Sequence, residues 1–140
     1  MKLKRVVVTG LGALTPIGNN IEEYWDGLVN GKSGAAPITY FDTEKFKTKF
    51  ACEIKNFKVE DFFDRKEARK LDRFAQYAIV ASDEAIKDAG IDLEGIDKLR
   101  VGVIWGAGIG GLETFQNEVL EFGKGDGTPR FNPFFFTSIF

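Results

Sequence analysis

Two short apolar runs, each stopped by a glycine, constrain the fold of this chain more than any other feature. The first is Val6–Val8, which Gly10 follows, and the second lies in residues 100–105 (Arg-Val-Gly-Val-Ile-Trp), which Gly106 follows. Apolar runs without polar alternation are typical of strands that are buried on both faces, as in a parallel sheet covered by helices. We therefore expect both runs to form buried strands.

Helical spacing appears between and after these runs. Residues 65–89 are the clearest case, because apolar side chains recur there every three or four positions and Gly90 can end the helix. The sequence of residues 112–122 predicts another helix. With a further helix before residue 65, the order is strand, helix, helix, strand, helix, which predicts an α/β fold.

The first helix is expected over residues 21–29. Asn19 or Asn20 can cap its start, two glutamates occupy its first turn, and Gly31 can end it. Residues 35–58 show no comparable spacing, so we expect them to be irregular apart from one short strand.

The 140-residue chain contains no histidine and one cysteine, Cys52. Catalytic pairs of Ser or Cys with His, and metal sites with His ligands, are therefore excluded within these residues. Cys52 lies in the expected short strand near residues 50–54, with no cation or helix start beside it, so we interpret it as a small, buried, unreactive side chain. One cysteine also excludes an internal disulfide.

The net charge of −2 does not favour nucleic-acid binding. The longest apolar run is far too short to span a membrane, and the first residues lack the features of a signal sequence. We therefore expect a cytoplasmic protein. Five phenylalanines fall in the last ten residues, whereas chain ends are usually polar, so we expect the chain to be part of a longer one.

The glycine-rich loop after the first run does not match a nucleotide-binding motif. Gly10 and Gly12 are followed by Thr15 and Pro16, where the dinucleotide motif requires a third glycine, and Pro16 lacks an amide donor for phosphate. We interpret this loop as a tight turn between a strand and a helix.

The second loop does match the motif through Gly106, Gly108 and Gly111, which leaves a Rossmann-type nucleotide-binding module as an alternative. The acidic residue at the expected spacing is Asp126, which lies among glycines and not at the end of a strand. The other interpretation is that these glycines allow a close backbone approach or border a narrow channel into which Ile109 points.

Five basic residues lie close together in the long predicted helix: Arg65, Lys66, Arg69, Lys70 and Arg73. On a continuous helix they would share one face, opposite the apolar stripe. The face is either simply solvated or a docking surface for an acidic partner.

Four separated segments resemble the start of the bacterial β-ketoacyl-[acyl-carrier-protein] synthases of the elongating type, synthase II. They are residues 6–19, residues 65–74, residues 106–111 together with Glu113, and residues 132–135 (Asn-Pro-Phe-Phe). The resemblance implies a thiolase-like fold of five α/β/α/β/α layers built from two similar halves. Residues 1–140 would be an incomplete N-terminal half, with no second domain present.

The resemblance also implies a function. Members of this family elongate acyl chains by decarboxylative Claisen condensation of an acyl thioester with malonyl-carrier protein, in fatty acid synthesis or, alternatively, in a polyketide pathway. The family's nucleophilic cysteine and its two catalytic histidines would lie beyond residue 140, and Cys52 does not match the nucleophile's Thr-Ala-Cys context. We therefore expect no catalytic residue, no metal and no cofactor in this chain, and no activity from it alone.

By the same resemblance, Ile109 and Phe135 correspond to positions that line the acyl-chain pocket. Lys66, Arg69, Lys70 and Arg130 correspond to the basic patch that binds the acyl carrier protein. Residue 131 is Phe, where related sequences often carry a second base. The parent enzyme is expected to be a homodimer that binds neither nucleic acid nor a membrane.

Overall fold

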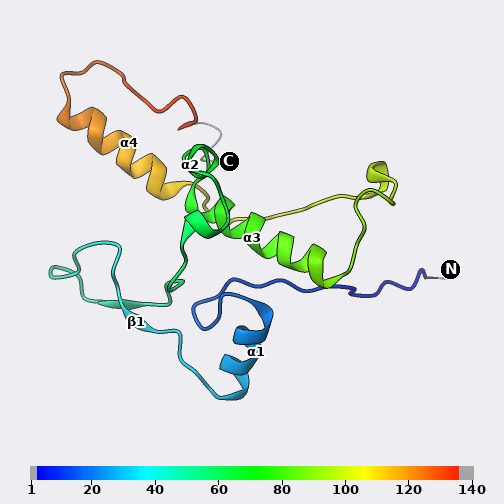
Figure 1. The fold of residues 1–140 in the computed structure, drawn as a ribbon. Coiled ribbons are helices and arrows are strands. Elements are labelled where there is room, and N and C mark those ends of the chain that lie inside the picture. The colour runs from blue at the N-terminus through cyan, green and yellow to red at the C-terminus, as the bar shows by residue number, and fades with distance from the viewer. Residues whose placement is uncertain (1–2, 136–140) are drawn as a thin grey trace. The chain divides into compact units, whose positions relative to one another are not determined.

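The computed structural model describes residues 3–135, and these fall into two compact units. The first unit combines the described part of Met1–Phe57 with Val80–Ile96, and the second combines Lys58–Ile79 with the described part of Asp97–Phe140. Helix α3 (Arg73–Asp88) contributes its first half to the second unit and its second half to the first (Figure 1).

In the first unit, helix α1 spans Ile21–Val29, as its spacing predicts. The side chain of Asn20 accepts a hydrogen bond from the Glu23 amide, so Asn20 is the N-cap. Gly31 follows the helix with a φ of 63°, the left-handed conformation that glycine adopts without strain. Strand β1 (Ala36–Pro37) pairs antiparallel with strand β2 (Phe50–Ala51), and the rest of residues 35–58 is irregular, as expected.

The first glycine loop packs directly against the second half of α3. A Cβ atom on Gly10 would overlap the Ala85 carbonyl oxygen, and one on Gly12 would overlap the Ala81 carbonyl oxygen. The loop is also held by carboxylates of α3: Glu84 accepts hydrogen bonds from the Ala13 and Ile21 amides, each 2.8 Å long. The tight turn predicted from the sequence is therefore also a close contact between backbones.

The second unit begins with the short helices η1 (Val59–Asp61) and α2 (Arg65–Ala68), and continues into the first half of α3. Its later part contains η2 (Lys98–Arg100) and α4 (Leu112–Lys124). Helix α4 confirms the prediction over residues 112–122.

The prediction of a single helix over residues 65–89 is wrong, because the helix is interrupted between α2 and α3. Buried Asp72 starts α3: its carboxylate accepts from the Phe74 amide, and its carbonyl accepts from the next two amides. The Gln76 side chain donates to the carbonyl oxygens of Ala68 and Leu71, which satisfies the backbone groups that the break exposes.

Neither apolar run forms the predicted buried strand within the described residues. Val6 and Ile104 are 89% and 97% exposed, and both runs are extended without ladder hydrogen bonds. A parallel strand requires a hydrogen-bonded neighbour, and β1 and β2 pair only with each other among residues 3–135. The mixed α/β composition is therefore right, while the parallel sheet is absent from this part of the chain.

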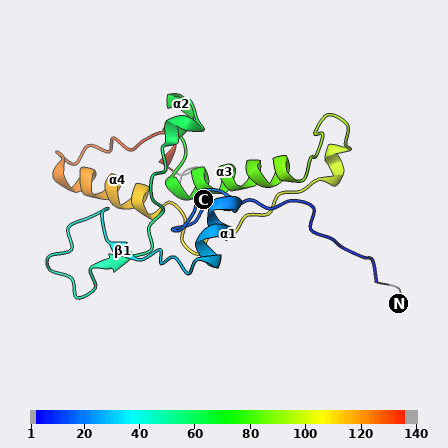
Figure 2. The ribbon, with the colours of Figure 1, turned by 60° about the horizontal axis from the view of Figure 1, so that its bottom comes forward.

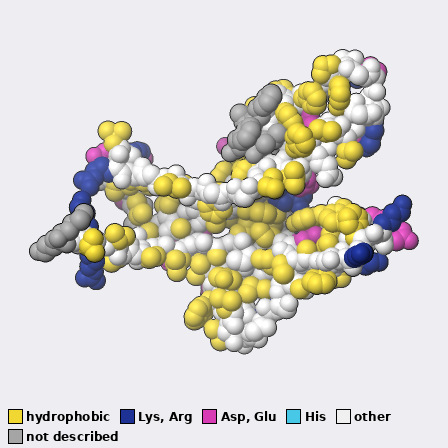
Figure 3. Space-filling view, turned by 180° about the vertical axis from the view of Figure 1, so that it is seen from behind, with side chains coloured by type: hydrophobic (Ala, Val, Ile, Leu, Met, Phe, Trp, Pro, Cys, Tyr) yellow, Lys and Arg dark blue, Asp and Glu magenta, His cyan; other side chains and the backbone are white. Residues whose placement is uncertain are grey.

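Many apolar side chains are exposed on the face that Figure 3 shows. Among residues 3–135, the buried apolar side chains are Val80 and Ala81, both in α3. No helix in this part of the chain is both long and apolar enough to cross a bilayer, and no group of three or more metal-ligating side chains occurs in it.

Candidate functional site

A basic hollow in the second unit gathers three of the predicted site residues. It has a volume of about 490 Å³. Its lining consists of Lys66, Arg69, Lys70, Asn132, Pro133 and Phe134. The segment after α4 turns back toward α2, so residues about sixty positions apart in the sequence share this surface (Figures 1 and 2).

The short helix α2 explains why the bases meet there. Asp64 caps the helix by accepting hydrogen bonds from the amides of Lys66 and Glu67, at 2.7 and 2.8 Å. The helix ends after four residues, and Arg69 is its C-cap. The Lys70 amide then donates to the Glu67 carbonyl oxygen, which closes the turn that carries Arg69 and Lys70.

An aromatic side chain forms part of the hollow. The Lys70 ammonium lies 5.5 Å from the centre of the Phe134 ring, which is a cation–π contact. Asn132 fixes this segment through two hydrogen bonds. Its side-chain oxygen accepts from the backbone amide of Phe134, and its own backbone amide donates to the Glu118 carboxylate. The site therefore combines positive charge with an apolar surface, a combination suited to an acidic protein that also presents apolar side chains.

Arg130 is not in this hollow. Its guanidinium pairs with Asp126 at 3.3 Å and lines a separate hollow of about 410 Å³ in the same unit. Sequence reasoning placed Arg130 with the other three bases, and the structure places it beside α4. The prediction of a single helical face with five bases is wrong, because the break after α2 separates Arg73, which pairs with Glu113 at 3.3 Å.

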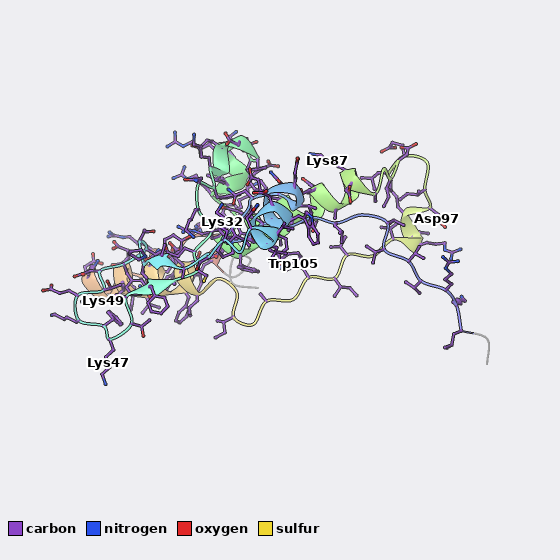
Figure 4. All side chains as sticks on the ribbon, turned by 90° about the horizontal axis from the view of Figure 1, so that it is seen from below. Lys32, Lys47, Lys49, Lys87, Asp97 and Trp105 are labelled. Carbon is purple, nitrogen blue, oxygen red and sulfur yellow. The ribbon has the colours of Figure 1, made fainter. Side chains whose placement is uncertain are left out.

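Ile109 lines an open, largely apolar hollow of about 730 Å³ between the first half of α3 and residues 105–110. Trp105, labelled in Figure 4, lines the same hollow. Phe135 is not in that lining: its ring stacks on Phe115 at 6.1 Å and on Phe131 at 5.6 Å. The roles of Ile109 and Phe135 in an acyl pocket stay predictions.

The second glycine loop does not favour nucleotide binding. Gly106 and Gly108 face open space, so no described backbone approaches them closely, and residues 101–105 directly before them form no strand. Asp126, the candidate ribose ligand, instead bonds to Thr128 and Arg130 within its own loop. The close approach that glycine permits occurs at the first loop.

Cys52 is exposed, so the prediction that it is buried is wrong. It follows β2, a strand of two residues that is too short to cover it. No contact in the described chain gives it a catalytic partner.

Sequence reasoning missed the contributions of Asn132, Pro133 and Phe134 to the basic hollow. Residues 132–135 form a sequence motif, but a motif does not show which distant segment it contacts. The excess of phenylalanine near residue 135 was the available signal, because such residues must pack against some other part of the chain.

Comparison with known proteins identifies the family. The model of the β-ketoacyl synthase N-terminal domain matches residues 3–138. The chain belongs to the β-ketoacyl synthase family. It is 48% identical over 132 residues to 3-oxoacyl-[acyl-carrier-protein] synthase 2 of Staphylococcus aureus strain N315. The match covers 94% of this chain and 32% of the relative, so the chain spans about a third of that protein's length.

Solved ketosynthase structures contain a backbone similar to that of this chain. The ishigamide ketosynthase/chain length factor matches with a TM-score of 0.72 and 32% identity, over 96% of this chain and 33% of that one. A type II polyketide synthase acyl-carrier protein in complex with its ketosynthase, bound to the hexaketide, matches with a TM-score of 0.74 and 26% identity. That match covers 98% of this chain and 36% of the other.

Proposed function

We propose that these residues form the N-terminal part of an elongating 3-oxoacyl-[acyl-carrier-protein] synthase. Such an enzyme transfers an acyl group from a carrier thioester to its own cysteine and condenses it with malonyl-carrier protein as carbon dioxide leaves. The 48% identity to a 3-oxoacyl-[acyl-carrier-protein] synthase 2 supports this function over a polyketide function, since the type II polyketide synthase structure is 26% identical. The five-layered thiolase-like arrangement, the homodimer and the cytoplasmic location belong to the same proposal.

Within this enzyme, the proposed role of the chain is to receive the carrier protein. The observation that carries the proposal is the hollow that brings Lys66, Arg69 and Lys70 around Phe134. Acidic side chains of a carrier protein would pair with the three bases, and one of its apolar side chains would contact the ring. Ile109 would border the path of the acyl chain, since it lines the large apolar hollow.

The chemical step would be performed by residues outside this chain. The 140 residues contain no histidine, and Cys52 is exposed beside a two-residue strand. We expect the chain by itself to show no condensation above buffer in a malonyl-dependent assay. Turnover by this chain that disappears on Cys52→Ala would contradict the proposal.

The docking surface is tested by reversing its charges. The triple variant Lys66→Glu/Arg69→Glu/Lys70→Glu of the complete gene product should bind a bacterial acyl carrier protein about tenfold more weakly or worse. This estimate takes roughly 0.5 kcal/mol for each of three exposed contacts. The loss should shrink at high salt, because exposed charges are screened over about 8–10 Å at physiological ionic strength.

A matched control reverses three lysines of the loop between β1 and β2, Lys45, Lys47 and Lys49. Lys47 extends outward from this loop (Figure 4), and the change in net charge is the same. If the control weakens binding as much as the triple variant does, the effect is one of net charge, and the hollow is not the docking surface.

A further inference from the structure

Arg130 lies among acidic side chains. Its hollow is also lined by Glu118, Glu121 and Asp126, and by one other base, Lys124. In contrast, the described residues that line the basic hollow include no carboxylate. An acidic partner would therefore meet three bases in a hollow whose described lining holds no carboxylate, whereas Arg130 is already paired with Asp126.

Two features hold Arg130 beside Asp126. Thr128 donates its amide to the Asp126 carboxylate at 2.9 Å, across a turn in which Gly127 has a φ of 83°. This hydrogen bond, followed by that from the Thr128 hydroxyl, holds the pKa of Asp126 below its ordinary value, because both stabilise the charged carboxylate.

The second feature is the ring of Phe131, next in sequence to Arg130. It packs on Phe122 at 5.5 Å and on Phe135 at 5.6 Å, which fixes the backbone that carries Arg130. Asp126 and Arg130 are the only acidic and basic residues between positions 125 and 135. Within this loop, Arg130 therefore has no other carboxylate to pair with, and Asp126 has no other base.

We propose that Asp126 competes with the acidic partner for the guanidinium of Arg130. This inference rests on the proposed function. The carrier protein would dock first on Lys66, Arg69 and Lys70, and would recruit Arg130 only by displacing Asp126. Asp126 thereby lowers the affinity and limits how long the partner stays bound, which suits an enzyme that must exchange carriers in each cycle.

The size of the effect follows from the exposure of the pair. The side chains of Arg130 and Asp126 are 77% and 64% exposed at a separation of 3.3 Å. Exposed pairs of this kind change an equilibrium by a factor of roughly 1.5 to 5. Asp126→Asn should therefore tighten binding of an acyl carrier protein by about that factor at low salt, and by less at high salt.

A double-mutant cycle separates local competition from a general change in charge. Affinity for acyl carrier protein is measured with Asp126→Asn, Arg130→Gln, and the combination, in the complete gene product. Competition predicts that Asp126→Asn tightens binding only while Arg130 is present. The control is Glu121→Gln, which removes the same charge in the same hollow from a residue paired with Lys124 at 3.4 Å.

The outcomes distinguish a failure of the competition by Asp126 from a failure of the docking surface. Tightening by Asp126→Asn that survives Arg130→Gln, or that equals the Glu121→Gln effect, overturns the competition. No tightening at all overturns it as well. If Lys66→Glu also leaves binding unchanged, the docking surface itself is wrong and the competition falls with it. If Lys66→Glu weakens binding, only the role of Asp126 is in question.

Discussion

Removing the Glu84 carboxylate should release the first glycine loop from α3. Its two carboxylate oxygens accept separate hydrogen bonds, one from the Ala13 amide within the loop and one from the Ile21 amide at the start of α1, both at 2.8 Å. The side chain is half-buried. A single residue of α3 therefore joins the loop and the first helix.

The magnitude follows from the number and type of these bonds. A hydrogen bond to a charged group contributes about 1.5–3 kcal/mol. Because Glu84 is partly exposed, we use the lower value for each bond, and Glu84→Ala should cost roughly 3 kcal/mol of local stability. Glu84→Gln retains one acceptor but turns an amide donor toward the other N–H, so it should lose about half of this value or more.

Hydrogen exchange measures this local stability directly. A loss of roughly 3 kcal/mol corresponds to about 100-fold faster exchange where exchange proceeds through local opening. Mass spectrometry of peptides spanning residues 10–21 reports it without requiring two-state unfolding. Asp83→Ala is the control, since it removes the same charge from an exposed neighbour on α3. Equal exchange in the two alanine variants would refute the role of Glu84.

Three further predictions follow from other contacts. Gly12→Ala should destabilise the loop by about 1–3 kcal/mol because its methyl group would overlap the α3 backbone, whereas Gly102→Ala, which faces open space, should be nearly neutral in thermal unfolding. Thr128→Val should raise the pKa of Asp126 part of the way to its ordinary value, since the hydroxyl's hydrogen bond is lost while that of the Thr128 amide remains. A carboxyl NMR titration checks this, and the stabilising pairing should disappear as pH falls through that pKa. The 140-residue chain alone should self-associate through exposed segments such as Val6–Val8, and a monodisperse monomer in size-exclusion chromatography would contradict this.

The helices could be predicted because their signals are local. Asn20 caps α1 and Gly31 follows it, and Gly90 follows α3 with a φ of 62°. Each of these signals acts within one turn of the helix it bounds. The surrounding fold does not need to be known for such elements to be recognised.

The break before α3 and the missing strands depend on distant contacts. Asp72 starts α3 while its carboxylate also accepts the amide and hydroxyl hydrogens of Thr114, about forty residues later. Spacing alone could not distinguish this arrangement from one continuous helix. Val6–Val8 has the composition of a buried strand, but composition does not supply the neighbouring strand that a ladder requires.

The candidate site also combines features that the local sequence predicts with features that depend on distant contacts. Lys66, Arg69 and Lys70 could be predicted as a group because they are close in the sequence, and the structure keeps them together around one hollow. Arg130 was assigned to that group by resemblance, but its environment depends on Asp126 and on the packing of Phe131. A residue's type and position can be carried over from a family, whereas the local charges that surround it must be observed.

Under the proposed function, the residues of this chain bind the carrier protein and do not perform the chemical step. The basic hollow lies entirely within the second unit and is formed by α2, the turn that follows it and residues 132–134. A covalent acyl intermediate and its proton transfers need a reactive thiol and imidazoles, and the chain offers an exposed Cys52 and no histidine. Substitutions in the hollow should therefore change the concentration of carrier protein needed for turnover while leaving the rate at saturation nearly unchanged. A charge reversal at Lys66 that lowered only the saturated rate would place this surface in the chemical step and contradict the docking role.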